Sequence, residues 1–373
     1  MSTNPAARCV AELDLVALRV NLEEIRSRLS ADAPLIAMVK ANAYGLGVGD
    51  VVPALREAGV RSFGVASAAE ADQLRELGVT EGVIVFGPLA PGMEGEVVAA
   101  RADATISDLR TIDALAEAAG GREVGIHVEV DTGMGRAGFP AAEVGAWGPE
   151  LRRRLDLPGV RWAGLFTHLH SADEAGGPGV ADQVASFEAV VSELRPPAEV
   201  ELHLANSAGV FRLAPRSRFG ARVGIFLYGG RPGPDAPAPE PVVHLRARIV
   251  RITEVPVGTT LGYGATHRAE TPARWATATI GYGDGLPRTL SNRGRALVRG
   301  RSAPIVGRVS MDLTTIDLTG LPEVEVGDFA TFLGRDGDAT LSVEEIAGHA
   351  GTISWEIFTG LAPRVTRAPY RGV

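Results

Sequence analysis

Residues 34–50 read PLIAMVKANAYGLGVGD. The first seven form a short apolar run that predicts a buried strand, and the glycine-rich remainder predicts a loop. Lys40 lies where the strand gives way to the loop, which is a common position for reactive groups in α/β folds.

Lys40 is also the only lysine, because 36 of the 37 basic residues in the chain are arginine. Arginine stays charged at any workable pH, whereas a desolvated lysine can lose its proton and attack a carbonyl, as Schiff-base catalysis requires. Lys40 could be a leftover surface residue, but its position and its chemistry together favour a catalytic amine.

Strand-like and helix-like segments alternate through the first two thirds of the chain. A helical pattern over residues 14–29 precedes eight strand-like runs, at 34–40, 61–66, 82–87, 102–107, 123–130, 160–169, 199–206 and 219–229. Helical patterns lie between most of them, for example at 48–58, 68–77, 108–118 and 181–194. This alternation predicts an α/β fold in which an N-terminal (β/α)8 TIM-like barrel is built from parallel strands.

A proline-rich linker at residues 231–242 ends the alternating pattern. Beyond it, short runs rich in Val, Ile and Thr are separated by turn residues, which predicts a mainly β C-terminal domain. One helix-like piece there begins with a capping box from Ser342 to Glu345. We therefore predict a barrel over residues 1–235 and a mainly β domain over residues 236–373.

Composition narrows the function classes. The net charge is −8 with no basic cluster, so nucleic acid and anionic membranes are poor candidate partners. Cys9 is the only cysteine, which excludes an internal disulfide and a cysteine-based metal site, and we expect no metal. The N-terminal stretch lacks the apolar core of a signal peptide and no apolar run is long enough to span a bilayer, so we expect a cytoplasmic protein.

Unusual polar residues occur at the predicted carboxyl ends of the barrel strands, where active sites of such barrels lie. After Lys40 on the first strand they are Arg136 after the fifth, His168 on the sixth, residues 203–207 on the seventh, and Arg222 with Gly224 and Ile225 on the eighth. Their convergence predicts one functional site at the mouth of the barrel.

Each of these residues also has a purely structural interpretation. His168 lies in an apolar strand and could be a satisfied core histidine, and Arg136 could be a surface residue beside a glycine turn. Asn206 and Ser207 could be a helix N-cap, although free N–H groups and a hydroxyl at a helix start also suit a phosphate. The combination of motifs, more than any one of them, supports a site.

Taken together, the motifs resemble those of the alanine racemases, which are pyridoxal-phosphate enzymes with a barrel and a C-terminal β domain. The matching segments cover nearly the whole chain in order: KANAYG (40–45), DTGMGRAG (131–138), FTH (166–168), HLANS (203–207), RVGIFLYG (222–229), GYGDG (281–285) and GRVSMD (307–312). The resemblance implies an isomerase that makes D-alanine for the cell wall.

The resemblance also implies a role for individual residues. Lys40 holds pyridoxal 5'-phosphate as a Schiff base and serves as one catalytic base, and Tyr263 is the base on the opposite face, supplied by the partner subunit of a head-to-tail homodimer. Racemisation needs such a pair, because a proton leaves one face of Cα and returns on the other. The other implied cofactor-binding residues are Tyr44, His168, Asn206, Ser207, Arg222, Gly224, Ile225 and Trp355.

Arg222 is expected to face the pyridine nitrogen, where a donor-only side chain keeps the ring unprotonated. The implied contacts of the substrate, a small amino acid, are Arg136, Met311, Asp312 and Tyr282. His168 and His203 are expected to support Tyr263 and Arg222.

Four positions depart from the family pattern. Glu129 stands where a lysine, often carbamylated, steadies the arginine at Arg136, so we expect Glu129 to supply a carboxylate directly if it reaches. Trp355 replaces a tyrosine, and Leu286 and Leu313 replace more polar residues. These changes leave serine or another small amino acid open as the substrate.

Two other functions compete with a racemase. One is a pyridoxal-phosphate-dependent decarboxylase of related fold, which must leave the substrate carboxylate free to depart, whereas Arg136 is matched to binding it. The other is a non-catalytic protein that carries pyridoxal phosphate, which would need neither the second domain nor Tyr263.

Overall fold

The computed structural model of the chain describes residues 8–213 and 218–370. Within them, eight parallel strands pair side by side, and the pairing of β10 with β2 and of β5 with β6 closes the ring. The strands are β2 (Leu35–Met38), β3 (Ser62–Val65), β4 (Gly82–Val85), β5 (Asp103–Ile106), β6 (Val124–Asp131), β8 (Val160–Phe166), β9 (Glu201–Ala205) and β10 (Gly220–Val223). The predicted barrel is confirmed.

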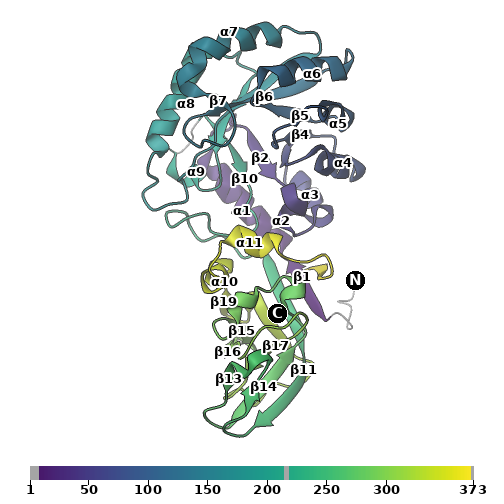
Figure 1. The fold of residues 1–373 in the computed structure, drawn as a ribbon, viewed down its shortest axis with the longest axis vertical. Coiled ribbons are helices and arrows are strands. Elements are labelled where there is room, and N and C mark those ends of the chain that lie inside the picture. The colour runs from purple at the N-terminus through teal and green to yellow at the C-terminus, as the bar shows by residue number, and fades with distance from the viewer. Residues whose placement is uncertain (1–7, 214–217, 371–373) are drawn as a thin grey trace.

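Helices surround the barrel (Figure 1), and three of them begin at side-chain caps, namely Asp14, Ser67 and Asp108. Asp14, for example, accepts hydrogen bonds from the N–H groups of Val16 and Ala17 at the start of α1 (Leu15–Arg28). The other helices of this part are α2 (Lys40–Tyr44), α3 (Val48–Glu57), α4 (Ala68–Glu76), α5 (Glu94–Ala99), α6 (Leu109–Ala119), α7 (Val144–Leu155), α8 (Val180–Leu194) and α9 (Gly209–Arg212). No helix among the described residues is long and apolar enough to cross a membrane.

The eighth predicted strand, residues 219–229, is too long. β10 ends at Val223, and the chain then turns, with the N–H groups of Tyr228 and Gly230 both donating to the carbonyl of Ile225. An apolar run was expected to continue a strand, but residues 225–228 are apolar because they fill the core beneath the turn.

The second part is a mainly β domain below the barrel in Figure 1. Its main sheet has the order β16-β15-β18-β11-β1-β20, and β14 and β17 extend it from β11. The strands after the barrel are β11 (Val243–Val255), β12 (Thr260–Leu261), β13 (His267–Arg268), β14 (Ala273–Ala278), β15 (Arg295–Val298), β16 (Arg301–Pro304), β17 (Thr314–Asp317), β18 (Phe329–Asp336), β19 (Ala339–Leu341) and β20 (Thr366–Pro369).

One strand of this sheet comes from the beginning of the chain. β1 (Cys9–Leu13) pairs antiparallel with β11 and parallel with β20, and all five of its residues are buried. Residues 9–13 therefore do not belong to the barrel, contrary to the assignment of residues 1–235 to it, because their backbone groups are satisfied in the other sheet. The boundary between residues 235 and 236 stays a prediction.

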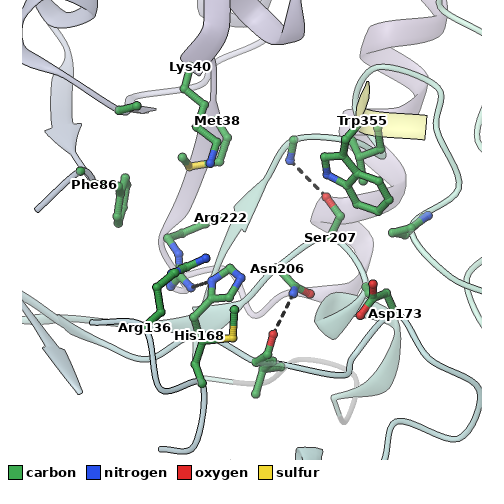
Figure 2. A pocket seen from close by; sticks show the side chains of 18 of the residues that line it. Met38, Lys40, Phe86, Arg136, His168, Asp173, Asn206, Ser207, Arg222 and Trp355 are labelled. Atoms are coloured by element: carbon green, nitrogen blue, oxygen red, sulfur yellow. Dashed lines mark hydrogen bonds between the residues drawn. The ribbon is translucent and has the colours of Figure 1, made fainter. Parts of the chain in front are cut away.

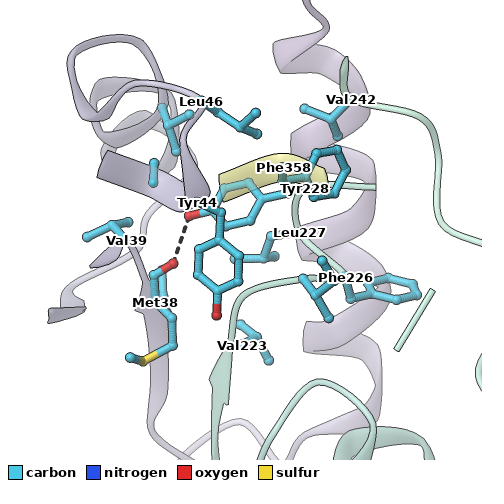
Figure 3. Packing of buried hydrophobic residues seen from close by; sticks show 14 of the residues in the cluster. Met38, Val39, Tyr44, Leu46, Val223, Phe226, Leu227, Tyr228, Val242 and Phe358 are labelled. Carbon is cyan, nitrogen blue, oxygen red and sulfur yellow. Dashed lines mark hydrogen bonds between the residues drawn. The ribbon is translucent and has the colours of Figure 1, made fainter. Parts of the chain in front are cut away.

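A short helix after α10 (Val343–Ala350) joins the two parts, and sequence patterns did not predict it. This helix, α11 (Ser354–Thr359), packs on α2, and Figure 3 shows Phe358 beside Tyr228 and Tyr44. The tyrosine rings are 5.0 Å apart, and the Tyr228 hydroxyl donates to the carbonyl of Met38 at 2.8 Å. The β domain is thereby anchored to the carboxyl end of the first barrel strand.

Candidate active site

A cavity of about 580 Å³ opens at the carboxyl ends of the barrel strands (Figure 2). Most of the predicted site residues line it: Lys40, Tyr44, Glu129, Arg136, His168, Asn206, Ser207, Arg222, Gly224, Ile225 and Trp355. His203 is fully buried behind the wall. Tyr263, Tyr282, Met311 and Asp312 do not line this cavity, and neither do Leu286 and Leu313.

Lys40 is followed by a left-handed turn, residues 41–44, in place of the predicted open loop. The φ angles of Ala41, Asn42, Ala43 and Tyr44 are 52°, 56°, 52° and 55°. Left-handed backbone costs L-residues roughly 1–2 kcal/mol each, so surrounding contacts must hold this turn.

Two contacts show how the turn is held. The Asn42 side chain accepts the N–H of Val48 at 2.9 Å and so begins α3. At Gly45, whose φ is 82°, an added Cβ would collide with the Phe358 carbonyl oxygen of α11.

The Lys40 amine stands at the open mouth of the cavity, reached by solvent but surrounded by protein groups. Burial among those groups lowers its pKa, and the positive charges of Arg136 and Arg222 lower it further, whereas Glu70 acts in the opposite direction. The amine is therefore easier to deprotonate than an ordinary lysine, which a base or a nucleophile requires.

Arg222 is fixed by four acceptors inside the barrel. Its Nη1 donates to Nδ1 of His203 at 3.0 Å and to that residue's carbonyl at 3.1 Å. Its Nη2 donates to the Thr167 carbonyl at 2.8 Å and to Nδ1 of His168 at 3.1 Å. The Nε–H has no partner among the described residues, so it remains available to an acceptor in the cavity.

Because arginine only donates, both histidine nitrogens that face it must be unprotonated acceptors. Burial, reinforced by Arg222, lowers the pKa of His168 to about 3 and that of His203 well below its usual value. Phe166 stacks on the His203 ring, with 4.9 Å between the ring centroids. The two histidines are neutral supports that orient the guanidinium.

His203 is itself held by residues that sequence reasoning missed. Its Nε2–H faces Nδ1 of His127 at 3.0 Å, and Nε2 of His127 lies 3.5 Å from the Asp103 carboxylate. His127 is two residues before Glu129 on β6, so both side chains point into the barrel. That period-2 relationship was the signal in the sequence that could have identified it.

Away from Arg222, one end of the cavity is lined by two hydroxyl groups, those of Tyr44 and Ser207, and by the backbone of Gly224. The Ser207 hydroxyl accepts the N–H of Gly224 at 3.1 Å. The hydroxyl of Tyr44 has no hydrogen-bond partner in the described chain, and a Cβ at Gly224 would collide with it. Burial raises the pKa of Tyr44, so the phenol stays protonated and can donate. Trp355 of α11 lies beside Ser207 (Figure 2).

Arg136 extends from a loop that Asp131 holds together. The Asp131 carboxylate accepts the N–H groups of Gly133 at 2.9 Å and Gly135 at 3.1 Å. The Arg136 guanidinium has no hydrogen bond or ion pair within the described residues and lines the cavity. A free guanidinium at this position can bind a carboxylate.

Glu129 does not contact Arg136 as expected. The buried carboxylate accepts a hydrogen bond from the Ser107 hydroxyl at 3.2 Å and forms no ion pair with the arginine. Burial raises its pKa, while Ser107 and Arg136 act against that rise. The two charges influence each other through space without a direct contact.

The remaining predicted residues gather on the β domain. Tyr263 is 69% exposed, in the hairpin between β12 and β13, and Tyr282 and Met311 are also exposed. The Tyr263 phenol and the segments around Tyr282 and Met311 therefore face solvent, outside the cavity of their own chain.

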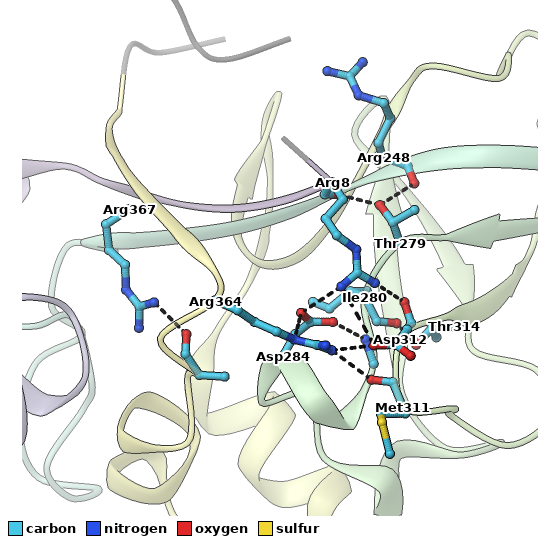
Figure 4. Close-up of polar contacts among 12 residues, drawn as sticks. Arg8, Arg248, Thr279, Ile280, Asp284, Met311, Asp312, Thr314, Arg364 and Arg367 are labelled. Atoms are coloured by element: carbon cyan, nitrogen blue, oxygen red, sulfur yellow. Dashed lines mark hydrogen bonds and ion pairs between the residues drawn. The ribbon is translucent and has the colours of Figure 1, made fainter. Parts of the chain in front are cut away.

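Ion pairs hold the exposed segments in place (Figure 4). Asp284, just after Tyr282, is buried and pairs with Arg364 at 2.8 Å and with Arg8 at 3.4 Å. Arg364 also pairs with Asp312 at 2.8 Å. The N–H of Gly283 donates to the Met311 carbonyl at 2.8 Å, so the two motifs are locked side by side.

The family model for the N-terminal domain of alanine racemase matches residues 13–232, and the model for the C-terminal domain matches residues 242–369. The chain belongs to the alanine racemase family.

Relatives in this family match over nearly their full length. An alanine racemase of Citrifermentans bemidjiense is 38% identical, covering 97% of this chain and 98% of that protein. The solved structure of alanine racemase from Streptomyces coelicolor A3(2) is similar, with a TM-score of 0.91 and 31% identity over 100% of both chains. That of Bartonella henselae, with covalently bound pyridoxal phosphate, has a TM-score of 0.86 and 28% identity, covering 98% of this chain and 100% of that one.

Proposed function

We propose that this chain is a pyridoxal-phosphate-dependent alanine racemase that interconverts L- and D-alanine and supplies D-alanine for the cell wall from the cytoplasm. The observation that carries the proposal is the grouping of the one side-chain amine, a donor-only arginine and a partnerless guanidinium around one cavity. Family membership over both domains adds to it.

The cavity suits pyridoxal phosphate at both of its ends. The unpaired Tyr44 hydroxyl and Ser207, with Asn206, Trp355 and the backbone of Gly224 and Ile225, would hold the phosphate. The free Nε–H of Arg222 would face the ring nitrogen, with His168 and His203 behind it. When bound, this cofactor supplies a carbonyl for the amine and a ring that withdraws electrons from Cα of the substrate.

The residues of the chain then have distinct tasks. Lys40, with its lowered pKa, holds or releases a proton on one side of Cα. Arg136 binds the substrate carboxylate, which keeps that group from leaving and so argues against a decarboxylase. Because Arg222 can only donate, it leaves the ring a weaker electron sink and limits side reactions.

The second base, Tyr263, would come from another copy of the chain. The phenol is exposed and outside its own cavity, so a head-to-tail homodimer would bring it, with the Met311 N–H, Asp312 and Tyr282, over the partner's substrate. A protein that only carries the cofactor would have no need of this exposed, ion-paired face.

Alanine fits the residues at hand, and serine or another small amino acid is the alternative. Trp355 borders the cavity and limits the size of the side chain. Leu286 is buried and Leu313 lies on the exposed face of the β domain, so Leu313 would act on the partner's site. In the same scheme, the boundary between the two functional domains lies between residues 235 and 236, and β1 joins the second domain although it precedes the barrel in the sequence.

Two measurements test this function. Borohydride treatment of the yellow holoenzyme should place the pyridoxyl label on Lys40, because no other side-chain amine exists. Incubation with a panel of L-amino acids in D2O should give loss of optical rotation and deuterium at Cα for alanine without CO2. If no amino acid loses optical rotation, the racemase proposal is wrong.

A further inference from the structure

Glu70 links the carboxyl ends of two neighbouring barrel strands. It lies in the first turn of α4, and its Oε1 accepts the N–H of Ala41 at 2.7 Å. Its other carboxylate oxygen, Oε2, accepts the N–H of Ala66 at 2.7 Å. Ala41 directly follows Lys40, after the first barrel strand, and Ala66 directly follows β3, the second barrel strand.

A carboxylate is the side chain that suits this position. Two N–H donors approach two separate oxygens, and an ionised glutamate offers an acceptor at each. Glutamine would offer one carbonyl oxygen and one NH2 group, so one of the two backbone donors would face another donor. Charge-assisted bonds of this kind are also shorter and stronger than neutral ones.

The held backbone is strained. Ala41 begins the left-handed turn, residues 41–44, which carries Tyr44 at its far end. Such a backbone persists only where neighbouring contacts determine it, and the Glu70 bond fixes its first amide. Because Lys40 directly precedes this turn, we expect a change in the turn to displace the Lys40 side chain.

Glu70 also contributes charge. Burial lowers the pKa of Lys40, Arg136 and Arg222 lower it further, and Glu70 opposes them. His168, two residues after the end of β8, and Glu129 on β6 border the same cavity. The carboxylate therefore has two effects on one amine, through the backbone and through space.

We propose that Glu70 is a positioning residue of this enzyme, which fixes the Lys40 amine at the barrel mouth by holding the N–H groups of Ala41 and Ala66. The proposal rests on the proposed function of Lys40. Glu70 does not line the cavity, so its influence passes through Lys40 and the left-handed turn.

The test compares Glu70→Gln with Glu76→Gln, which removes an exposed carboxylate from the end of the same helix. With substrate, Glu70→Gln should lower kcat by about 10- to 100-fold through misplacement of the amine, with KM nearly unchanged. Glu76→Gln should match the wild type, and Glu70→Asp, which keeps the charge, should recover part of kcat.

A second readout does not depend on activity. In the full-length chain freed of cofactor, Lys40 labelled with 15N gives a single side-chain amine signal, because the chain has no other lysine. Its pKa should be lower in Glu70→Gln than in the wild type and unchanged in Glu76→Gln. Hydrogen exchange at the Ala41 and Ala66 amides should be slow in the wild-type holoenzyme and faster in Glu70→Gln.

Fast hydrogen exchange at the Ala41 amide of the wild type would overturn the proposal, and this measurement does not depend on the folding of any variant. So would a Lys40 pKa and a kcat that Glu70→Gln leaves unchanged. If the wild type racemised no amino acid, the proposed function would fail while the amine titration and the exchange rates would still report on Glu70.

Discussion

Arg222 and His203 form a hydrogen bond inside the barrel, with 3.0 Å between Nη1 of the arginine and Nδ1 of the histidine. Because the arginine can only donate, the histidine is neutral and carries its proton on Nε2, toward His127. This relationship, repeated on the other side by His168, makes Arg222 a fixed cation that no neighbour can deprotonate. Burial lowers the pKa of Arg222 only to about 10.

Arg222→Glu should change which product forms. A carboxylate accepts a hydrogen bond where arginine can only donate one, so it would favour protonation of the pyridine nitrogen of the proposed cofactor. A protonated ring withdraws electrons from Cα more strongly. We expect the ratio of pyruvate formed by half-transamination to D-alanine formed to rise by about tenfold or more. Arg218→Glu, an exposed arginine just before β10, is the control. An unchanged ratio would contradict the role of Arg222.

The buried neutral histidines predict a loss of stability in acid. Burial and nearby cations hold the pKa of His168 at about 3, below its ordinary value of 6.5, and lower that of His203 as well. As the pH falls from 7 to 5, the unfolded chain takes up protons that the native chain does not, so each such histidine reduces the free energy of unfolding by up to about 2 kcal/mol.

Urea unfolding of the cofactor-free chain at several pH values measures this dependence. His168→Asn should flatten the slope between pH 7 and 5, whereas His267→Asn, in the β12–β13 hairpin, should leave it as in the wild type. A slope that His168→Asn does not change would show that the histidine is protonated in the folded protein.

Mixing two inactive variants tests whether the active site is shared. Lys40→Ala and Tyr263→Phe should each lower activity by at least about 100-fold, the usual contribution of general acid–base groups. After unfolding and refolding together, half of the dimers are mixed and each has one intact site, so activity should return to about a quarter of the wild type. A mixture as inactive as its parts would mean that Tyr263 acts in its own chain or not at all.

Glu129 predicts an effect on binding. Its carboxylate interacts with Arg136 through space and would repel a substrate carboxylate bound to that arginine. Glu129→Gln should therefore lower KM for alanine about two- to fivefold, with kcat little changed. Ser107→Ala, which removes only the hydrogen bond to Glu129, is the control. A higher KM would instead show that Glu129 positions Arg136 directly.

Local pattern predicted the barrel, because alternating apolar strands and amphipathic helices leave few other arrangements. Local pattern was wrong about the end of the eighth strand, because residues 225–228 are apolar in order to fill the core from a turn and do not continue the strand. It also missed α11, a six-residue helix that is stabilised by Phe358 packing on Tyr228 and not by its own periodicity. Short elements depend on their neighbours, and neighbours are not visible in a local window.

The sequence by itself determined the fold class, the single amine at the end of the first barrel strand, and the motifs that converge on one mouth. Only the tertiary structure decided the pairing of β1 with β11, the chain of histidines behind Arg222, the separation of Glu129 from Arg136 and the carboxylate of Glu70 beneath Ala41. The reason is physical: strand and helix patterns follow from side chains that are near in sequence. Hydrogen bonds and burial between distant segments exist only once the chain has closed the barrel.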